Sequence, residues 1–247
     1  MAVPVALITT NIRVAVSEQA VYDYSVRNYG ASETSGIPEE ELLRANGEMQ
    51  NYLTAEDAGP LAINVRHNRG MAGPLFNARE TAHMADVRDL VQVLFAVQII
   101  SVAAVLSLAV VILAIWPPRA LAMALLCGAL LTGGILGAAG LLVASGFDSA
   151  WTEFHVLAFS NDFWQLDPRT DHLIQMFPEA FWQKITTFIV MSTLLEALLM
   201  LGSSAAYIVL SRSRSLERIA LPAPAVAGPE GHARPKLAAP SPRHYFR

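Results

Sequence analysis

Long apolar blocks, separated by short polar segments, dominate the second half of the chain. They cover residues 90–116, 120–146 and 185–210. The first block contains Gln92 and Gln98, the third contains Glu196, and the second has no charged residue. A helix of about 26 residues is ~39 Å long, which is enough to cross ~30 Å of hydrocarbon. The pattern therefore predicts three transmembrane helices.

A shorter apolar run lies at residues 2–8. It lacks the basic start and small-residue cleavage site of a signal peptide. We interpret residues 1–10 as the outer end of a first transmembrane helix that is shortened in this chain; a short buried or interfacial segment is the alternative. The predicted fold is mainly α and integral to the membrane: a four-helix transmembrane bundle, with a small extracellular α+β domain between helices 1 and 2 and an interfacial loop between helices 3 and 4. The predicted boundaries are 1–10, 11–89, 90–116, 120–146, 147–184, 185–210 and, for a disordered basic cytoplasmic tail, 211–247.

Composition and charge agree with a membrane protein and predict its orientation. Hydrophobic residues make up 53% of the chain and charged residues 15%, with a mean hydropathy of +0.40. Residues 211–247 hold seven basic residues against two acidic ones, whereas residues 11–89 hold twelve acidic residues against seven basic ones. Because basic segments stay in the cytoplasm, residues 11–89 and the loop at 147–184 are predicted to lie outside. The net charge of −4 does not suggest a nucleic-acid partner.

Local signals predict the elements around the crossings. Pro38 and the glutamates after it favour a helix that starts there and ends near Tyr52. Residues 61–65 resemble a short strand, with a turn at 67–70 that suggests a hairpin. Asn77 and Glu80 form a capping-box pair, which predicts a helix that runs from about residue 78 into the crossing at residue 90. The loop at 147–184 is rich in aromatic residues, which is typical of a segment lying in the headgroup layer.

Two histidines, His83 and His155, lie among carboxylates just outside apolar blocks and on the same predicted membrane face. A facing pair of imidazoles could accept and return a proton near pH 7. A structural hydrogen-bonding role is an alternative, and a metal site is another, since His83 with Asp86 and His155 with Asp162 could supply ligands. No HExxH, Walker or Gly-x-Ser-x-Gly pattern is present.

Two motifs resemble a known family. The pattern F-N-x-R-E-x-x-H-M-x-D-V covers residues 76–87, and F-H-x-x-x-F-x-N-D-x-W-x-L-D-P-x-x-D-x-L-I-x-M-F-P-E-x-F-W covers residues 154–182. Together they resemble the lipoprotein intramolecular transacylases, the Lit proteins of bacteria, and the likeness extends over about residues 3–210. It implies four helices and a small extracellular domain between the first two.

The resemblance also implies a reaction at the extracellular face of the bacterial cytoplasmic membrane. Such enzymes move the sn-2 acyl chain of a diacylglyceryl-modified lipoprotein to the α-amine of its N-terminal cysteine, among membrane phospholipids and without a cofactor or metal. On this basis His83 is assigned as general base and His155 as partner acid or oxyanion donor, and their order remains open. The supporting residues are Glu80, Asp86, Asn161 and Asp162. A related acyltransferase or hydrolase with another lipid substrate, a non-catalytic membrane scaffold and a transporter remain alternatives.

Overall fold

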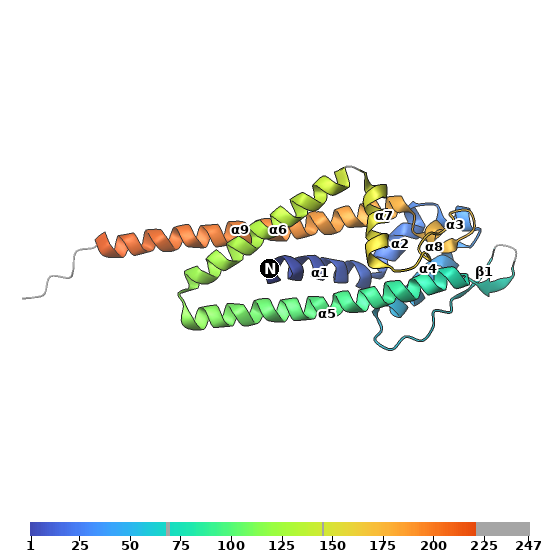
Figure 1. Cartoon of the computed structure of the whole chain (residues 1–247), viewed down its shortest axis with the longest axis horizontal. Helices are drawn as coiled ribbons and strands as arrows, with labels where there is room; N and C mark the ends of the chain where they lie inside the picture. The colour runs from blue at the N-terminus through green and yellow to red at the C-terminus, as the bar shows by residue number, and fades with distance from the viewer. Residues whose placement is uncertain (68–69, 145, 221–247) are drawn as a thin grey trace, which may run out of the picture. The chain divides into compact units, whose positions relative to one another are not determined.

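The structure, a computed structural model, describes residues 1–67, 70–144 and 146–220, and the chain divides into two compact units, Met1–Val209 and Leu210–Arg247. The described chain is mainly helical, as predicted (Figure 1). Its elements are α1 (Ala2–Ser17), α2 (Gln19–Asn28), α3 (Ala31–Ser35), α4 (Glu39–Thr54), β1 (Asn64–Arg66), β2 (Ala72–Pro74), α5 (Ala78–Ile115), α6 (Pro118–Ala144), α7 (Phe147–Ala158), α8 (His172–Met176) and α9 (Glu179–Ala220).

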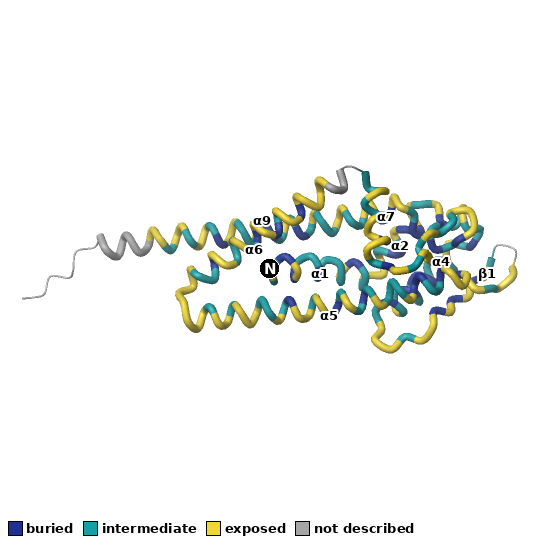
Figure 2. Tube along the Cα trace, viewed as in Figure 1, coloured by how far each residue is buried: buried dark blue, intermediate teal, exposed yellow. Residues whose placement is uncertain are grey.

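Within the described residues, three helices are long and apolar enough to cross a membrane, in agreement with the three predicted crossings. They belong to α5, α6 and α9. Many of their large apolar side chains are exposed (yellow in Figure 2), as a lipid-facing surface requires. The starts of α6 and α9 differ from the predicted residues 120 and 185. Pro118 and Pro178 explain the earlier starts, because the φ angle of proline suits the beginning of a helix.

Helix α1 passes the predicted boundary at residue 10 and is, at 16 residues, shorter than the three crossings. Asn11 Nδ2 donates a hydrogen bond of 2.9 Å to Glu196 of α9, and Arg13 Nη1 donates one of 3.1 Å to Gln98 of α5. Both acceptors lie inside predicted crossings, so α1 packs beside these crossings beyond residue 10. Polar side chains are tolerated there because partners on the neighbouring helices satisfy them. Glu196 therefore faces α1.

The segment predicted to form the outer domain has an apolar core, to which α2, α4 and the hairpin contribute together with α8 from the later loop. Helix α4 confirms the predicted helix after Pro38. Strand β1 pairs with β2 in antiparallel register, with Val65 opposite Gly73. The strand is shorter than the predicted 61–65 and shifted along the chain, and turn residues 68 and 69 lie outside the described residues. Buried core side chains include Tyr22, Ile37, Leu42, Met49, Val65, Leu75, Met176, Phe177 and Phe181.

The last helix also differs from the prediction. Residues 211–220 continue α9, although the predicted disordered tail starts at residue 211. No helix-breaking residue marks the end of the crossing, because the first proline after it is Pro222. The helix therefore continues beyond the apolar block. The remainder of the predicted tail, residues 221–247, lies outside the described residues.

Candidate active site

The N-terminal end of α5 positions His83. Asn77 caps this helix by accepting hydrogen bonds from the backbone N–H groups of Arg79 and Glu80, and the Glu80 carboxylate in turn accepts one from the Asn77 N–H. The predicted capping box is therefore present. His83 follows Glu80 by three residues, on the same side of the helix. Residues 78–89 carry all the charged side chains of α5 and precede its apolar block, so His83 lies outside the membrane-spanning segment.

Helix α7 positions His155. Its Nδ1 atom lies 2.7 Å from the carbonyl oxygen of Trp151, one helical turn earlier. A carbonyl only accepts hydrogen bonds, so Nδ1 carries the proton and donates it to Trp151. In the neutral ring, Nε2 then has a free lone pair that can accept a proton. The indole of Trp151 also packs edge-on to His155, with ring centroids 4.7 Å apart.

The two histidines meet. Their ring centroids are 6.0 Å apart and the planes are inclined by 36°. Both are buried, with exposed fractions of 6% for His83 and 7% for His155. Phe159 covers the pair, with ring centroids 5.1 Å from His83 and 5.6 Å from His155, and Trp164 lies 5.0 Å from His155. Among the described residues, Nδ1 of His83 is buried without a hydrogen-bond partner.

Burial and mutual proximity alter the acid–base properties of the pair. Burial, and then the neighbouring His155, lower the pKa of His83 from 6.5 to about 4, against an opposing effect of Asp86. Burial also lowers the pKa of His155, and the hydrogen bond to Trp151 opposes that change. Both rings are therefore neutral at pH 7, so one can accept a proton while the other donates an N–H bond.

The carboxylates predicted to support the pair have different positions. Asp86 lies one turn after His83, and its Oδ2 accepts a hydrogen bond of 2.9 Å from Asn161 Nδ2. Asp162 is exposed and bonds to Gln165, at 3.5 Å between Oδ1 and Nε2. The prediction that Asp162 orients a histidine is therefore not supported by its contacts, because the turn after Phe159 directs it to solvent while Asn161 faces α5.

Glu80 also has a different partner from the one predicted. It is buried, and its Oε1 accepts a hydrogen bond of 2.6 Å from the backbone N–H of Leu173 in α8. Burial raises the pKa of Glu80, and the N–H groups of Asn77 and Leu173 oppose that rise. This carboxylate joins the start of α5 to α8 instead of contacting an imidazole.

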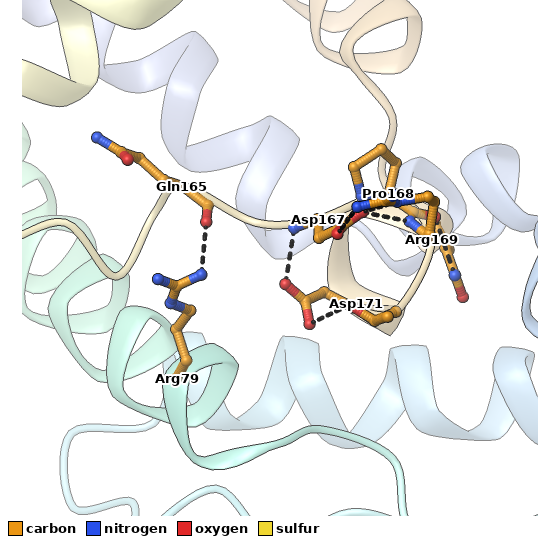
Figure 3. A network of polar contacts seen from close by, with 8 residues as sticks. Arg79, Gln165, Asp167, Pro168, Arg169 and Asp171 are labelled. Carbon is orange, nitrogen blue, oxygen red and sulfur yellow. Dashed lines mark hydrogen bonds and ion pairs between the residues drawn. The ribbon is translucent and has the colours of Figure 1, made fainter.

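Further bonds fix the segment between α7 and α8 on α5. Arg79 Nη1 donates to the Gln165 carbonyl at 2.9 Å, as Figure 3 shows. Asp171 accepts from the Asp167 N–H at 2.7 Å and from Asn77 Nδ2 at 2.9 Å. Sequence reasoning missed these anchors, because their partners are mostly backbone groups. Trp151 could have been found, since its position four residues before His155 places its carbonyl within reach of that ring.

Other features of the described chain do not join the pair. Among residues 1–67, 70–144 and 146–220, no three His, Cys, Asp or Glu side chains are grouped so that they could bind a metal ion. A cavity of about 290 Å³ lies beside the end of α4, and one of about 270 Å³ lies between α1, α5 and α6. Neither is lined by His83 or His155. The ring of His67 contacts His172 instead, at 6.1 Å between centroids.

The fold and this site define a helical membrane protein with a buried pair of neutral histidines next to the membrane-spanning segments. The family model of the lipoprotein intramolecular transacylase Lit matches residues 1–182. The chain therefore belongs to the lipoprotein intramolecular transacylase family. A search of curated proteins found no match.

Three solved structures share the fold. All are in meso structures of the membrane integral lipoprotein intramolecular transacylase Lit from Bacillus cereus, and each is 20% identical to this chain. The first has a TM-score of 0.72 and covers 86% of this chain and 93% of the other. The other two carry a histidine substitution, to arginine (TM-score 0.70; 87% and 90% covered) and to alanine (TM-score 0.70; 86% and 91% covered).

Proposed function

We propose that this transacylase moves the sn-2 acyl chain of a diacylglyceryl lipoprotein to the α-amine of the lipidated N-terminal cysteine. The main support for the proposal is that the rings of His83 and His155 lie side by side, with their centroids 6.0 Å apart, in a member of this family. Donor ester and acceptor amine belong to one residue, so holding them together supplies much of the rate through proximity. The products are one amide and a free hydroxyl at sn-2, and the sn-1 ester remains.

The proton steps suit two neutral imidazoles. About a tenth of an α-amine with a pKa near 8 is unprotonated at pH 7, so the free amine can attack the ester carbonyl directly. His155 accepts the proton released from the attacking nitrogen at Nε2, and the Trp151 carbonyl stabilises the resulting imidazolium. His155 then gives that proton to the sn-2 oxygen as the C–O bond breaks, which is acid–base catalysis by one group.

His83 serves as the neutral donor in this scheme. Its lowered pKa keeps the ring uncharged, and the neutral N–H group donates a hydrogen bond to the tetrahedral oxyanion. The Nδ1–H bond of His155 thus favours His155 as base, the reverse of the order of roles taken from the resemblance. Asp86 and Asn161 support the pair, because their hydrogen bond joins α5 to the loop that follows Phe159.

The location and partners are part of the proposal. Basic residues near the C-terminus and acidic outer segments support a multi-pass protein of the bacterial cytoplasmic membrane with the histidines on the extracellular face. Diacylglyceryl lipoproteins are the substrates, embedded among phospholipids.

The test is expression in a host whose lipoproteins carry two ester-linked chains and a free amine. Fragmentation of the N-terminal lipopeptide by mass spectrometry should show one amide-linked and one ester-linked chain. His83→Ala and His155→Ala should each reduce product formation by about 10²–10⁴-fold, the range for loss of an acid–base group. His67→Gln is the matched control, since that ring contacts His172, and should retain activity. A free amine with folded wild-type protein present would disprove the proposed reaction.

A further inference from the structure

Large apolar side chains are also exposed outside the crossings, in the loop predicted to lie in the headgroup layer. In the described residues 18–67 and 70–89 of the outer domain, the exposed large apolar side chains are Tyr24 and Met71. In contrast, four occur within ten residues at the end of α7 and just after it. We call these four the apolar edge: Phe154 (42% exposed), Val156 (58%), Leu157 (86%) and Phe163 (43%).

The apolar edge is continuous with the membrane-spanning surface. Helix α7 follows α6, one of the three spanning helices, directly in the chain. Figure 1 shows α7 running across the direction of α5 and α9, as a helix lying in the plane of a membrane surface does. The side chains of α5, α6 and α9 that face lipid are exposed to the same degree, for example Ile100 at 68%.

The edge also adjoins the histidine pair. Val156 and Leu157 directly follow His155, which points the other way and is buried. The ring of Phe154 lies 5.1 Å from His155 and 6.3 Å from Phe159, the residue that covers both histidines. Glu153 and Asp148 on the same helix are exposed, so α7 carries charges that hold it at headgroup depth and prevent deeper insertion.

We propose that the apolar edge inserts into the outer leaflet of the lipid bilayer and places His155 at the depth of lipid ester groups. A membrane-anchored ester would then reach the pair from the side, without leaving the bilayer. The entry of the ester from the side rests on the proposed function, whereas the insertion of the apolar edge does not. A second copy of the chain is the other possible occupant of such a surface, and the experiment below separates the two.

Fluorescence quenching measures the insertion without requiring activity. In a Cys127→Ala background, Leu157→Cys is labelled with a small fluorophore and reconstituted into phosphatidylcholine–phosphatidylglycerol vesicles. Met71→Cys is the matched control, because Met71 is an exposed apolar side chain (66%) of the outer domain. The label at position 157 should be quenched by nitroxide-bearing lipids and several-fold less by iodide, and the label at position 71 should show the opposite pattern.

Two results would overturn the insertion. Iodide quenching at position 157 as strong as at position 71 would place the edge in water. Protection from both quenchers would mean that protein covers the edge, as in a dimer. If insertion holds but wild-type protein forms no N-acylated product, the proposed function fails and the insertion stands.

The link to catalysis has its own test. Leu157→Asp should raise the KM for a vesicle-borne diacylated lipopeptide several-fold with kcat nearly unchanged, because access is impaired while the pair is intact. Leu157→Phe should restore the KM, and Met71→Asp should leave both constants unchanged. An unchanged KM in Leu157→Asp would show that the edge does not serve substrate access.

Discussion

At the residue scale, the surroundings of His83 and His155 determine how each ring handles a proton. Phe159 and Trp164 exclude water from the pair, and this burial lowers both pKa values. The Trp151 carbonyl then distinguishes the two rings, because it fixes the proton of His155 on Nδ1. The two histidines therefore differ in how readily each accepts or donates a proton.

This burial predicts a pH dependence of stability. The pKa of His83 is lowered from 6.5 to about 4 on folding, so between these values the unfolded chain binds a proton that the folded chain does not. Stability contributed by the neutral ring is therefore complete above about pH 6.5 and is lost as the pH falls towards 4, by at most about 3 kcal/mol. Thermal denaturation in detergent measures the loss. His83→Gln should flatten the profile; an unchanged profile would contradict the burial effect.

At the element scale, the start of α5 is bonded both to α8 and to the segment between α7 and α8. Its capping box fixes where the helix begins, and the same Glu80 carboxylate also holds α8 through Leu173. Arg79 and Asp86 add bonds to the segment between α7 and α8. The positions of His83 and His155 thus depend on one helix end.

We therefore predict that Glu80 contributes to the stability of the fold and not directly to catalysis. Glu80→Ala leaves the N–H groups of Asn77 and Leu173 without their acceptor, which should lower the free energy of unfolding by about 2–4 kcal/mol. Glu80→Gln keeps one acceptor oxygen and should lose less. Denaturation in detergent gives the stabilities. Full stability of Glu80→Ala with lost activity would instead indicate that Glu80 acts on the histidines.

The bond between Asn11 of α1 and Glu196 of α9 gives a second prediction at this scale. A double-mutant cycle with Asn11→Ala and Glu196→Ala should give a coupling energy of about 0.6 kcal/mol, and up to ~1.7 kcal/mol, as for other hydrogen bonds between membrane helices. Glu196→Gln keeps an acceptor and should retain most of the coupling. Strictly additive single effects would show that the bond does not stabilise the packing of α1.

At the scale of the whole molecule, charge is distributed unequally between the two predicted membrane faces. The acidic outer domain and the loop that carries His155 lie on one side of the crossings, and the Trp116–Arg119 turn lies on the other. This distribution predicts that the histidine pair lies on the outer face, because basic segments are retained in the cytoplasm.

The orientation can be measured with cysteine labelling of intact cells in the Cys127→Ala background. Met71→Cys should react with a membrane-impermeant maleimide from outside. Arg119→Cys should react after permeabilisation only. The reverse pattern would place the histidine pair on the cytoplasmic face and exclude the proposed location.

The amino-acid sequence by itself determined the three crossings, the helix start at Asn77 and the motifs that resemble the family. A long apolar block has one favourable place, the bilayer, where its backbone must form hydrogen bonds within a helix, and a capping box acts between residues three apart. Both signals are local. The extent of α1 was not predictable in this way, because Asn11 and Arg13 find their partners on other helices.

Only the tertiary structure decided which side chains surround the histidines. The packing of α7 and its following loop on α5 brought His155 to His83, paired Asn161 with Asp86, and left Asp162 in solvent. A sequence motif does not distinguish the adjacent residues Asn161 and Asp162. In the fold, the side chain of Asn161 bonds to Asp86, whereas that of Asp162 is exposed. Proximity between distant segments arises from the summed packing of the fold, and no spacing along the chain encodes it.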